Sequence, residues 1–299
     1  MTIYALYNPY SGHNTGKEKA SKLQSLYETP LTFLDMTSIA SYADFAASLA
    51  PDDRIIVCGG DGTLNRFIND TYGLNIKNDI FYYATGSGND FLRDFGLKAG
   101  SAPMRINDEI KNLPTVTVNG KSYRFINGIG YGLDGWCCEI GDELRRTSEK
   151  PVSYSAIAIK GLLKDYTPTN ATITVDGVTH TYNRVWIAPT MVGRYYGGGL
   201  MPAPHQNRND RADHISVGVM HSWGRLRTFL AFPGVSKGKH IKKKKLAAEW
   251  QGKCITVEFD RPVALQIDGE TILGVTKYEV TVDGYKADAP VAEEATANV

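Results

Sequence analysis

Three stretches of the chain combine glycine with small polar residues, as phosphate-binding loops do. The first is Asn8-Pro9-Tyr10-Ser11-Gly12, the second runs from Val57 to Asn65 around Gly59-Gly60-Asp61-Gly62-Thr63, and the third runs from Thr85 to Phe91. Glycine lets the backbone approach a phosphate, and a helix that begins after such a loop offers free N–H groups and the positive end of its dipole. Each loop could be a plain strand-to-helix turn, but three together favour a polyphosphate site.

The three loops follow predicted strands. From Thr2 to Gly96 short apolar runs alternate with segments of helical period, which predicts a mainly parallel sheet covered by helices. Because the carboxyl ends of parallel strands meet at one edge, the loops should lie together there. The expected strands are Ile3–Tyr7, Leu31–Leu34, Arg54–Cys58 and Ile80–Ala84, and the expected helices are Lys17–Tyr27, Tyr42–Ala50, Leu64–Tyr72 and Asn89–Phe95.

After about residue 115 the pattern changes to polar/apolar alternation, which predicts a mainly antiparallel β second half. Hairpin dipeptides occur at Asn119-Gly120, Asp176-Gly177, Asp268-Gly269 and Asp283-Gly284. Apolar spacing predicts a few helices there, at Trp136–Arg146, Val152–Lys164 and Arg225–Phe232. We therefore expect an α/β nucleotide-binding domain at residues 1–115, a β-rich domain at 116–287, and a disordered tail at 288–299, where small and acidic residues offer little apolar surface.

Composition narrows the class of protein. The chain has 299 residues with 42% hydrophobic content, which can fill the cores of two domains. Its 33 basic residues nearly cancel its 32 acidic ones, so no overall field favours a nucleic-acid partner. Four cysteines without paired spacing favour a reducing compartment. No charged start is followed by an apolar run, and no stretch approaches the roughly 20 apolar residues of a membrane span, so we expect a cytoplasmic protein.

One local cluster of charge stands out, with basic residues at Lys237, Lys239, His240 and 242–245. Such a run can attract an anionic lipid surface at about 1 kcal/mol per basic residue, or it can be a solvated segment. Nearby Trp223, Phe229, Phe232 and Pro233 could lie at a lipid interface or in a core, and a core is favoured.

The glycine loops, taken with three later motifs, resemble the diacylglycerol kinase catalytic-domain family, which includes bacterial lipid kinases and sphingosine kinases. The resemblance covers residues 2 to 285. It implies an α/β nucleotide domain related to NAD kinases and phosphofructokinases, followed by an antiparallel β-sandwich domain, with the active site in the cleft. The motifs are Asn8-Pro9-x-Ser11-Gly12, Gly59–Thr63, Gly86–Phe91, Asn127–Asp134, Gly197–Pro204 and Leu265–Glu270.

The resemblance also implies roles for individual residues. It assigns the general base to Glu270, although the residues alone indicate an ordinary hairpin turn at Asp268-Gly269. Asp268 would orient Glu270 or bind magnesium through water, and Asp61 and Asp134 would face the cleft. ATP would be held by Asn8, Ser11, Gly12, Thr37, Gly59, Gly60, Asp61, Gly62, Thr63, Leu64, Asn65 and Ser87.

One stretch departs from the family pattern. Many members hold a structural magnesium with an Asp-Gly pair in the loop before a β-strand. Here that stretch runs from Arg208 to Val217, and its candidate ligands Asp210 and Asp213 are not followed by glycine. A metal site and a pair of solvated loop carboxylates both stay open.

The sequence thus predicts an ATP-dependent, magnesium-requiring lipid kinase, peripheral to the membrane and active in phospholipid biosynthesis, with diacylglycerol as the leading acceptor. A homodimer formed through exposed strand edges stays open. One alternative is an NAD kinase-like enzyme, which shares the Gly-Gly-Asp-Gly-Thr loop but has an Asn-Glu pair that is missing here. Another is a non-catalytic, membrane-recruited nucleotide-binding module, against which the intact Asp61 and Glu270 argue.

Overall fold

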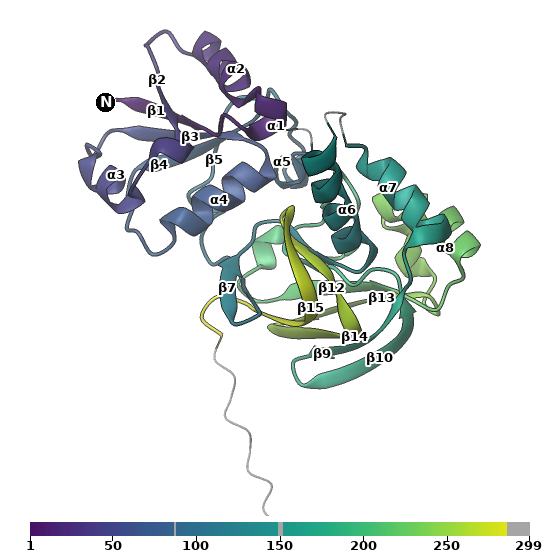
Figure 1. Cartoon of the computed structure of the whole chain (residues 1–299). Helices are drawn as coiled ribbons and strands as arrows, with labels where there is room; N and C mark the ends of the chain where they lie inside the picture. Colours follow the sequence, from purple (N-terminus) through teal and green to yellow (C-terminus); the bar gives the residue numbers. More distant parts are fainter. Residues whose placement is uncertain (87, 149–151, 286–299) are drawn as a thin grey trace, which may run out of the picture.

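The chain folds into two units, each built on its own β-sheet (Figure 1). The computed structural model describes residues 1–86, 88–148 and 152–285. Ser87, one of the predicted ATP-binding residues, and the predicted tail at 288–299 lie outside the described residues.

The first sheet has the strand order β2-β1-β3-β4-β5. The first four strands are parallel, and the short β5 pairs antiparallel with β4 at the edge. The mainly parallel sheet predicted from the sequence is therefore confirmed. The strands are β1 (Ile3–Tyr7), β2 (Thr32–Asp35), β3 (Arg54–Gly59), β4 (Asp79–Ala84) and β5 (Met104–Arg105).

Helices cover both faces of this sheet because its strands are apolar on both faces. In β1, Ala5 and Tyr7 face a core with Ala20 and Leu23, while Leu6 faces the opposite core with the helix that follows β3. Figure 1 shows α2 and α4 on opposite sides of the sheet. The helical segments are α1 (Ser11–Asn14), α2 (Gly16–Ser21), η1 (Lys22–Leu26), η2 (Met36–Ser38), α3 (Tyr42–Ser48), α4 (Asp61–Thr71) and α5 (Asp90–Asp94).

The second sheet is antiparallel at every pairing, as the alternation predicts. It begins at Thr115, and three of the four predicted hairpin turns form; Asp283-Gly284 instead lies in a turn after the last strand of the described residues. The strands are β6 (Thr115–Val118), β7 (Lys121–Arg124), β8 (Gly128–Tyr131), β9 (Thr169–Val175), β10 (Val178–Val185), β11 (Thr190–Met191), β12 (Ile215–Met220), β13 (Ala247–Gly252), β14 (Cys254–Ile267) and β15 (Glu270–Thr281).

The long strand β14 joins the two parts of this domain. Its residues 255–259 pair with β9, and its residues 265–267 pair with β8 after a register shift. The inward side chains of these strands form one apolar core, in which Tyr131 stacks on Phe259 with ring centroids 3.8 Å apart. A β-rich second domain with a sandwich-like core is the result.

Helices of the second domain pack on one another and on the sheet around the buried Trp186. Trp223 is buried in the same region, and Phe229 and Phe232 pack against this core, so the core interpretation is confirmed for the three aromatic residues; it is wrong for Pro233, which is exposed. The helical segments are α6 (Leu133–Thr147), α7 (Tyr154–Lys160), the π-helical turn η3 (Gly161–Asp165), η4 (Arg208–Asp210), α8 (Arg225–Ala231), η5 (Phe232–Lys237) and η6 (Lys239–Lys242).

The fold bears on two expectations, one about the cysteines and one about membrane-spanning segments. All four cysteines are free thiols. None of the helices in the described part of the chain has the length and apolarity that crossing a bilayer requires.

We expect Ile173→Ala to lower the free energy of unfolding by about 2–5 kcal/mol, because Ile173 is fully buried in the centre of β9 and its truncation leaves a cavity. Urea unfolding measures the difference. Thr172→Ala on the other face of the same strand is the control and should change stability by less than about 0.5 kcal/mol. Equal effects of the two substitutions would contradict the burial pattern of β9.

Candidate active site

The loops after β3 and β4 touch each other backbone to backbone. The Thr85 N–H donates to the Gly59 carbonyl at 2.8 Å, and a Cβ added to Gly86 would lie 2.5 Å from the Cα of Gly60. No larger residue fits this contact without a shift of the chain. The two glycine loops therefore form one continuous backbone surface at the carboxyl edge of the sheet.

The helix α4 begins directly at this surface. Its N-cap residue is Gly60, which has no side chain to cap the helix, and the first intrahelical bond joins the Leu64 N–H to the Gly60 carbonyl. The backbone N–H groups of residues 61–63 are therefore left for a ligand, in the arrangement that binds phosphate.

The side chains that follow in α4 point inward. Thr63, Leu64 and Asn65 are all buried. Leu64 belongs to the apolar core, and Asn65 bonds to other protein groups. Of the contacts predicted between ATP and these three residues, the one through the Thr63 N–H is thus available, whereas the Leu64 N–H bonds to the Gly60 carbonyl and the Leu64 and Asn65 side chains face the interior.

The loop after β1 is held by its own hydrogen bonds. Asn8 Oδ1 accepts from the Tyr10 N–H at 3.0 Å, and the Asn8 carbonyl accepts from the Ser11 hydroxyl at 2.8 Å. Gly12 has a φ of +58°, and a Cβ there would lie 2.7 Å from Lys19 Nζ. The loop therefore carries a nearby ammonium group that the sequence interpretation did not include.

Thr37 follows β2, the neighbour of β1. Its hydroxyl and its N–H both bond to Asp35 Oδ1, at 2.7 and 2.8 Å. Thr37 lies at the same carboxyl edge as the other loops but at the outer strand of the sheet.

Asp61 joins the two glycine loops through its carboxylate. Its oxygens accept from the N–H groups of Asp90 at 2.8 Å and Phe91 at 3.2 Å, which begin α5. Burial raises the pKa of the Asp61 carboxyl, and these N–H groups, Asn127 and the charge of Arg208 oppose that rise. Asp61 is therefore positioned at the N-termini of two helices.

Asp90 is a second buried carboxyl at this edge. Its Oδ2 accepts from the Gly198 N–H at 2.7 Å, which ties α5 to the second domain. Its Oδ1 has no hydrogen-bond partner among the described residues and lies 3.8 Å from the Arg93 guanidinium. Burial raises the pKa of the Asp90 carboxyl to about 6, with the Gly198 N–H opposing and the charge of Asp61 adding to the rise.

Asp134, expected at the cleft, is buried in the first turn of α6. Its carboxylate lies against Gly130 of β8 and beside Tyr196. Burial raises the pKa of this carboxyl to about 6, and the Tyr196 hydroxyl lowers it.

Asp268 connects the two domains. Its Oδ2 accepts from Asn65 Nδ2 of α4 at 2.8 Å and from the Ile126 N–H at 2.6 Å, and its Oδ1 accepts from the N–H groups of Asn127 and Gly128 at 2.9 and 3.0 Å. Burial raises the pKa of the Asp268 carboxyl to about 6, while these backbone donors lower it. The four donors satisfy the carboxylate form, so the oxygens of Asp268 are engaged by protein groups from both domains.

Glu270 begins β15, two residues after this anchored turn. Its side chain is exposed, and its Oε1 lies 4.0 Å from where a Cβ on Gly62 would be. The Glu270 backbone pairs with Ile267 in the hairpin, but its side chain makes no hydrogen bond or ion pair within residues 1–86, 88–148 and 152–285. The carboxylate predicted as the base therefore stands free beside the N-terminus of α4, across the junction of the two domains.

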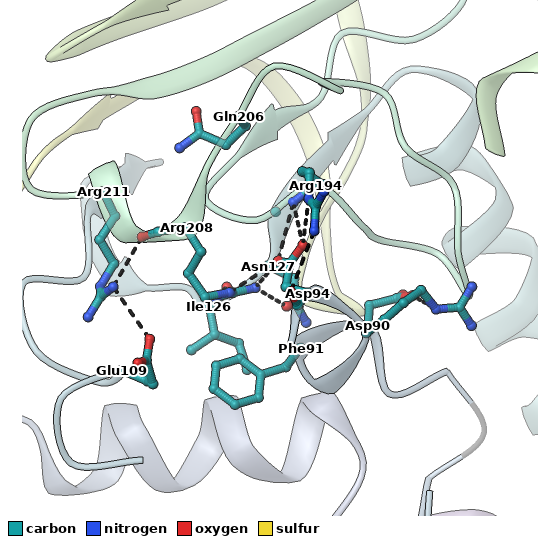
Figure 2. A network of polar contacts seen from close by, with 12 residues as sticks. Asp90, Phe91, Asp94, Glu109, Ile126, Asn127, Arg194, Gln206, Arg208 and Arg211 are labelled. Carbon is teal, nitrogen blue, oxygen red and sulfur yellow. Dashed lines mark hydrogen bonds and ion pairs between the residues drawn. The ribbon is translucent and has the colours of Figure 1, made fainter. Parts of the chain in front are cut away.

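The stretch expected to hold a metal places a guanidinium between the domains instead. Arg208 is buried and binds Asp94 of α5 at 2.9 Å, Asn127 Oδ1 at 2.9 Å and the Ile126 carbonyl (Figure 2). Its guanidinium also lies 4.7 Å from the centre of the Phe91 ring. A cation of the protein itself thus occupies this part of the interface.

Asp210 and Asp213 are not assembled into a metal site. Asp210 Oδ2 lies 4.0 Å from His214 Nε2. In the described part of the chain, no group of three or more His, Cys, Asp or Glu side chains could hold a metal ion. Of the two interpretations left open by the sequence, a pair of solvated loop carboxylates agrees better with this geometry than a metal site does.

The sequence analysis gave no individual role to several residues of this site. Asp90 had a usable signal, a carboxyl at the start of a helix after a glycine loop. Asn127 bonds to Asp268 and Arg208, which lie 141 and 81 residues away in the sequence, and no local pattern distinguishes Lys19 or Arg208 from other basic residues. Only the fold brings them together.

Comparison with known proteins agrees with this architecture. Residues 2–118 match the diacylglycerol kinase catalytic domain, and residues 127–286 match the YegS C-terminal NAD kinase beta sandwich-like domain. The fold and site thus define a kinase with a nucleotide-binding α/β domain and a β-rich partner domain. The chain belongs to the diacylglycerol kinase catalytic-domain family of lipid kinases, which implies ATP as the phosphate donor.

Individual relatives are distant. The chain is 25% identical to a diacylglycerol kinase of Bacillus subtilis (strain 168), over 89% of this chain and 88% of that protein. It is also 25% identical to a diacylglycerol kinase of Mycobacterium tuberculosis (strain ATCC 25618 / H37Rv), over 80% and 79%. A crystal structure of a diacylglycerol kinase from Bacillus anthracis str. Sterne shares the fold, with a TM-score of 0.60, 19% identity and coverage of 94% and 93%.

We expect Arg208→Ala to lower the free energy of unfolding by about 3–5 kcal/mol, because it leaves Asp94 buried beside a vacated guanidinium site. Arg194→Ala is the matched control, since Arg194 pairs with the same Asp94 but its side chain is 41% exposed; its loss should cost about 0–1 kcal/mol. Urea unfolding compares the two. Similar costs would show that the buried guanidinium does not hold the interface.

We expect the stability of Asp90→Asn relative to the wild type to depend on pH. The Asp90 carboxyl has a folded pKa raised from 3.8 to about 6, so the folded state binds the proton more tightly and the contribution of Asp90 to wild-type stability falls as pH rises from 4 to 6. Asparagine stays neutral, so the variant should gain about 2–3 kcal/mol on the wild type between pH 4 and pH 7. Paired urea unfolding at each pH tests this, and a difference independent of pH would contradict it.

Proposed function

We propose that this protein transfers the γ-phosphoryl group of ATP to the free hydroxyl of diacylglycerol and so forms phosphatidic acid. The observation that carries the proposal is the position of Glu270, a free carboxylate from the second domain beside the backbone N–H groups that begin α4. The base comes from the second domain and the phosphate-binding backbone from the first. The acceptor hydroxyl would therefore bind between them, at the junction of the two domains.

The cradle is built from backbone and therefore suits a polyphosphate. The close approach of Gly60 to Gly86 leaves no side chain above the loops, and the N–H groups at the start of α4 point to the same edge. Lys19 beside Gly12 adds a positive charge at the loop after β1. These donors favour charge that develops on the phosphoryl oxygens during transfer.

Magnesium fits beside Asp61 and Asp90 better than at the loop carboxylates. Both carboxyls are buried close to Gly88 in the glycine loop, their pKa values are raised by burial, and Asp90 Oδ1 lacks a hydrogen-bond partner among the described residues. Magnesium in kinases is commonly held by one or two carboxylates together with phosphates and water. When bound, it neutralises charge on the β- and γ-phosphates.

Glu270 acts as the general base. It accepts the proton of the acceptor hydroxyl as the oxygen forms a bond to the γ-phosphorus and the bond to the leaving ADP oxygen breaks. Asp268 holds the turn that carries Glu270 and is a positioning residue, because its carboxylate accepts four hydrogen bonds from protein donors.

Relatives support diacylglycerol as the acceptor. The Bacillus subtilis and Mycobacterium tuberculosis proteins to which the chain is similar are diacylglycerol kinases. Diacylglycerol lies in the bilayer, so the enzyme would work peripherally at the membrane, and phosphatidic acid places the reaction in phospholipid synthesis.

We expect Glu270→Gln to lower kcat for phosphate transfer by about 10²–10⁴-fold, because glutamine cannot accept the hydroxyl proton. The assay follows label from γ-labelled ATP into phosphatidic acid in mixed micelles with magnesium. Glu279→Gln, an exposed glutamate on the same strand, is the control and should keep wild-type kcat. Unchanged nucleotide affinity in Glu270→Gln would separate a lost base from a lost ATP site.

Rival acceptors belong in the same assay. Label on NAD would indicate a ribose hydroxyl as acceptor, and label on sphingosine would indicate a sphingoid base. Binding of ATP without transfer to any acceptor would indicate a nucleotide-binding module and overturn the proposal. Transfer that survives chelation by EDTA would overturn the magnesium requirement.

A further inference from the structure

Four exposed aliphatic side chains gather on one flank of the second domain. Ile159 and Leu163, four residues apart in α7 and η3, are each 47% exposed; Leu226 and Leu230, four residues apart in α8, are 65% and 69% exposed. Residues four apart lie on the same side of a helix. Each helix therefore presents a pair of aliphatic side chains to solvent.

The two helices lie against each other, so the pairs belong to one surface. The Arg225 guanidinium at the start of α8 donates to the carbonyls of Gly161 and Leu162 at 3.2 and 3.3 Å. Arg225 directly precedes Leu226 in the chain, and Leu162 directly precedes Leu163. Figure 1 shows α7 and α8 side by side at the outer flank of the second domain. We call Ile159, Leu163, Leu226 and Leu230 the aliphatic flank.

Basic residues accompany these side chains. Lys160 and Lys164 follow Ile159 and Leu163 directly, and Arg227 follows Leu226; all three are exposed, and Lys160 is paired with Asp165 at 2.9 Å. The segment from His221 to Ala248 contains two arginines, six lysines and no acidic residue, whereas the whole chain is nearly neutral. Lys237, Lys239 and the lysines at 242–245 are exposed. Positive charge is thus concentrated in the segments that carry or follow the aliphatic flank.

Exposed aliphatic side chains edged by lysine and arginine match the surface of an anionic bilayer, where apolar groups enter the headgroup region and basic groups pair with lipid phosphates. A second copy of the chain is a poorer occupant, because it would bring like charges together. We propose that the aliphatic flank and its lysines dock this protein on anionic lipid membranes. The proposal deepens the proposed function, since it says how the enzyme meets a bilayer substrate.

The position of the flank suits this role. Helix α6 lies between it and the catalytic turn: Gly141 of α6 lies against the Tyr154 ring of α7, and Gly135 lies against the Ala264 carbonyl of β14. Glu270 follows β14 after the Asp268-Gly269 turn. A membrane bound at the flank is therefore separated by one helix from the strand pair that carries the base.

The test is vesicle co-sedimentation with the full-length protein, using phosphatidylcholine vesicles with and without about one-third phosphatidylglycerol. We expect the wild type to bind the anionic vesicles more tightly, with the difference shrinking at high salt. Leu226→Ser/Leu230→Ser should weaken binding at least about tenfold, since burial of two leucines is lost. Lys244→Gln/Lys245→Gln should weaken anionic binding by about fivefold per lysine. Val178→Ser, 60% exposed on β10, is the control and should bind like the wild type.

Two further readouts separate docking from folding and from catalysis. Leu226→Trp should show a blue shift of tryptophan fluorescence on adding anionic vesicles, as the ring enters the headgroup region. The leucine double variant should phosphorylate a dispersed short-chain diacylglycerol at the wild-type rate but lose activity on diacylglycerol in vesicles. Vesicle binding without phosphorylation of any lipid would leave the docking surface supported and overturn only the proposed function.

Three results would overturn the proposal. The first is equal vesicle binding by the wild type and the leucine double variant. The second is no binding of the wild type to anionic vesicles. The third is a wild-type dimer in sedimentation equilibrium that the leucine substitutions convert to a monomer, since the flank would then be an interface between copies.

Discussion

The rest of the site depends on one buried carboxylate, that of Asp268. It sits in the turn between β14 and β15 and is held by four donors, one from α4 of the first domain and three from the backbone at residues 126–128. A carboxylate bonded on all sides in a buried place has one orientation. This orientation fixes the turn, and the turn carries Glu270 to the start of α4.

A second set of buried charges fixes the same junction from the other side. Arg208 reaches from the second domain to Asp94 at the end of α5, while Asp61 and Asp90 hold the beginning of α5. Buried carboxyls with raised pKa values cost stability at neutral pH, and such a cost is common where a protein binds charged ligands. The buried charges thus lower the stability of the folded state, and in return they hold the phosphate-binding edge of the first sheet in one geometry.

Much of the fold could be predicted because its signals are local. The βα alternation gave four parallel strands, and the glycine-containing dipeptides at residues 119–120, 176–177 and 268–269 gave three hairpins. The residues of the site were harder to predict, because their contacts come from distant parts of the chain. Leu64 and Asn65 share a motif with Gly60, but helical geometry turns their side chains into the interior. Asp210 and Asp213 offered metal-ligand chemistry, but no third ligand among the described residues converges on them, and a guanidinium occupies the interface nearby.

The sequence by itself determined the two architectures and the glycine loops at the sheet edge, because periodicity, turn propensity and motif spacing act over a few residues. Only the tertiary structure decided which polar groups are consumed by the fold and which stay available. Asp268 and Glu270 are two residues apart, yet one is saturated by distant donors and the other stands in solvent. That difference arises from long-range packing between the two domains, which short-range sequence patterns do not encode.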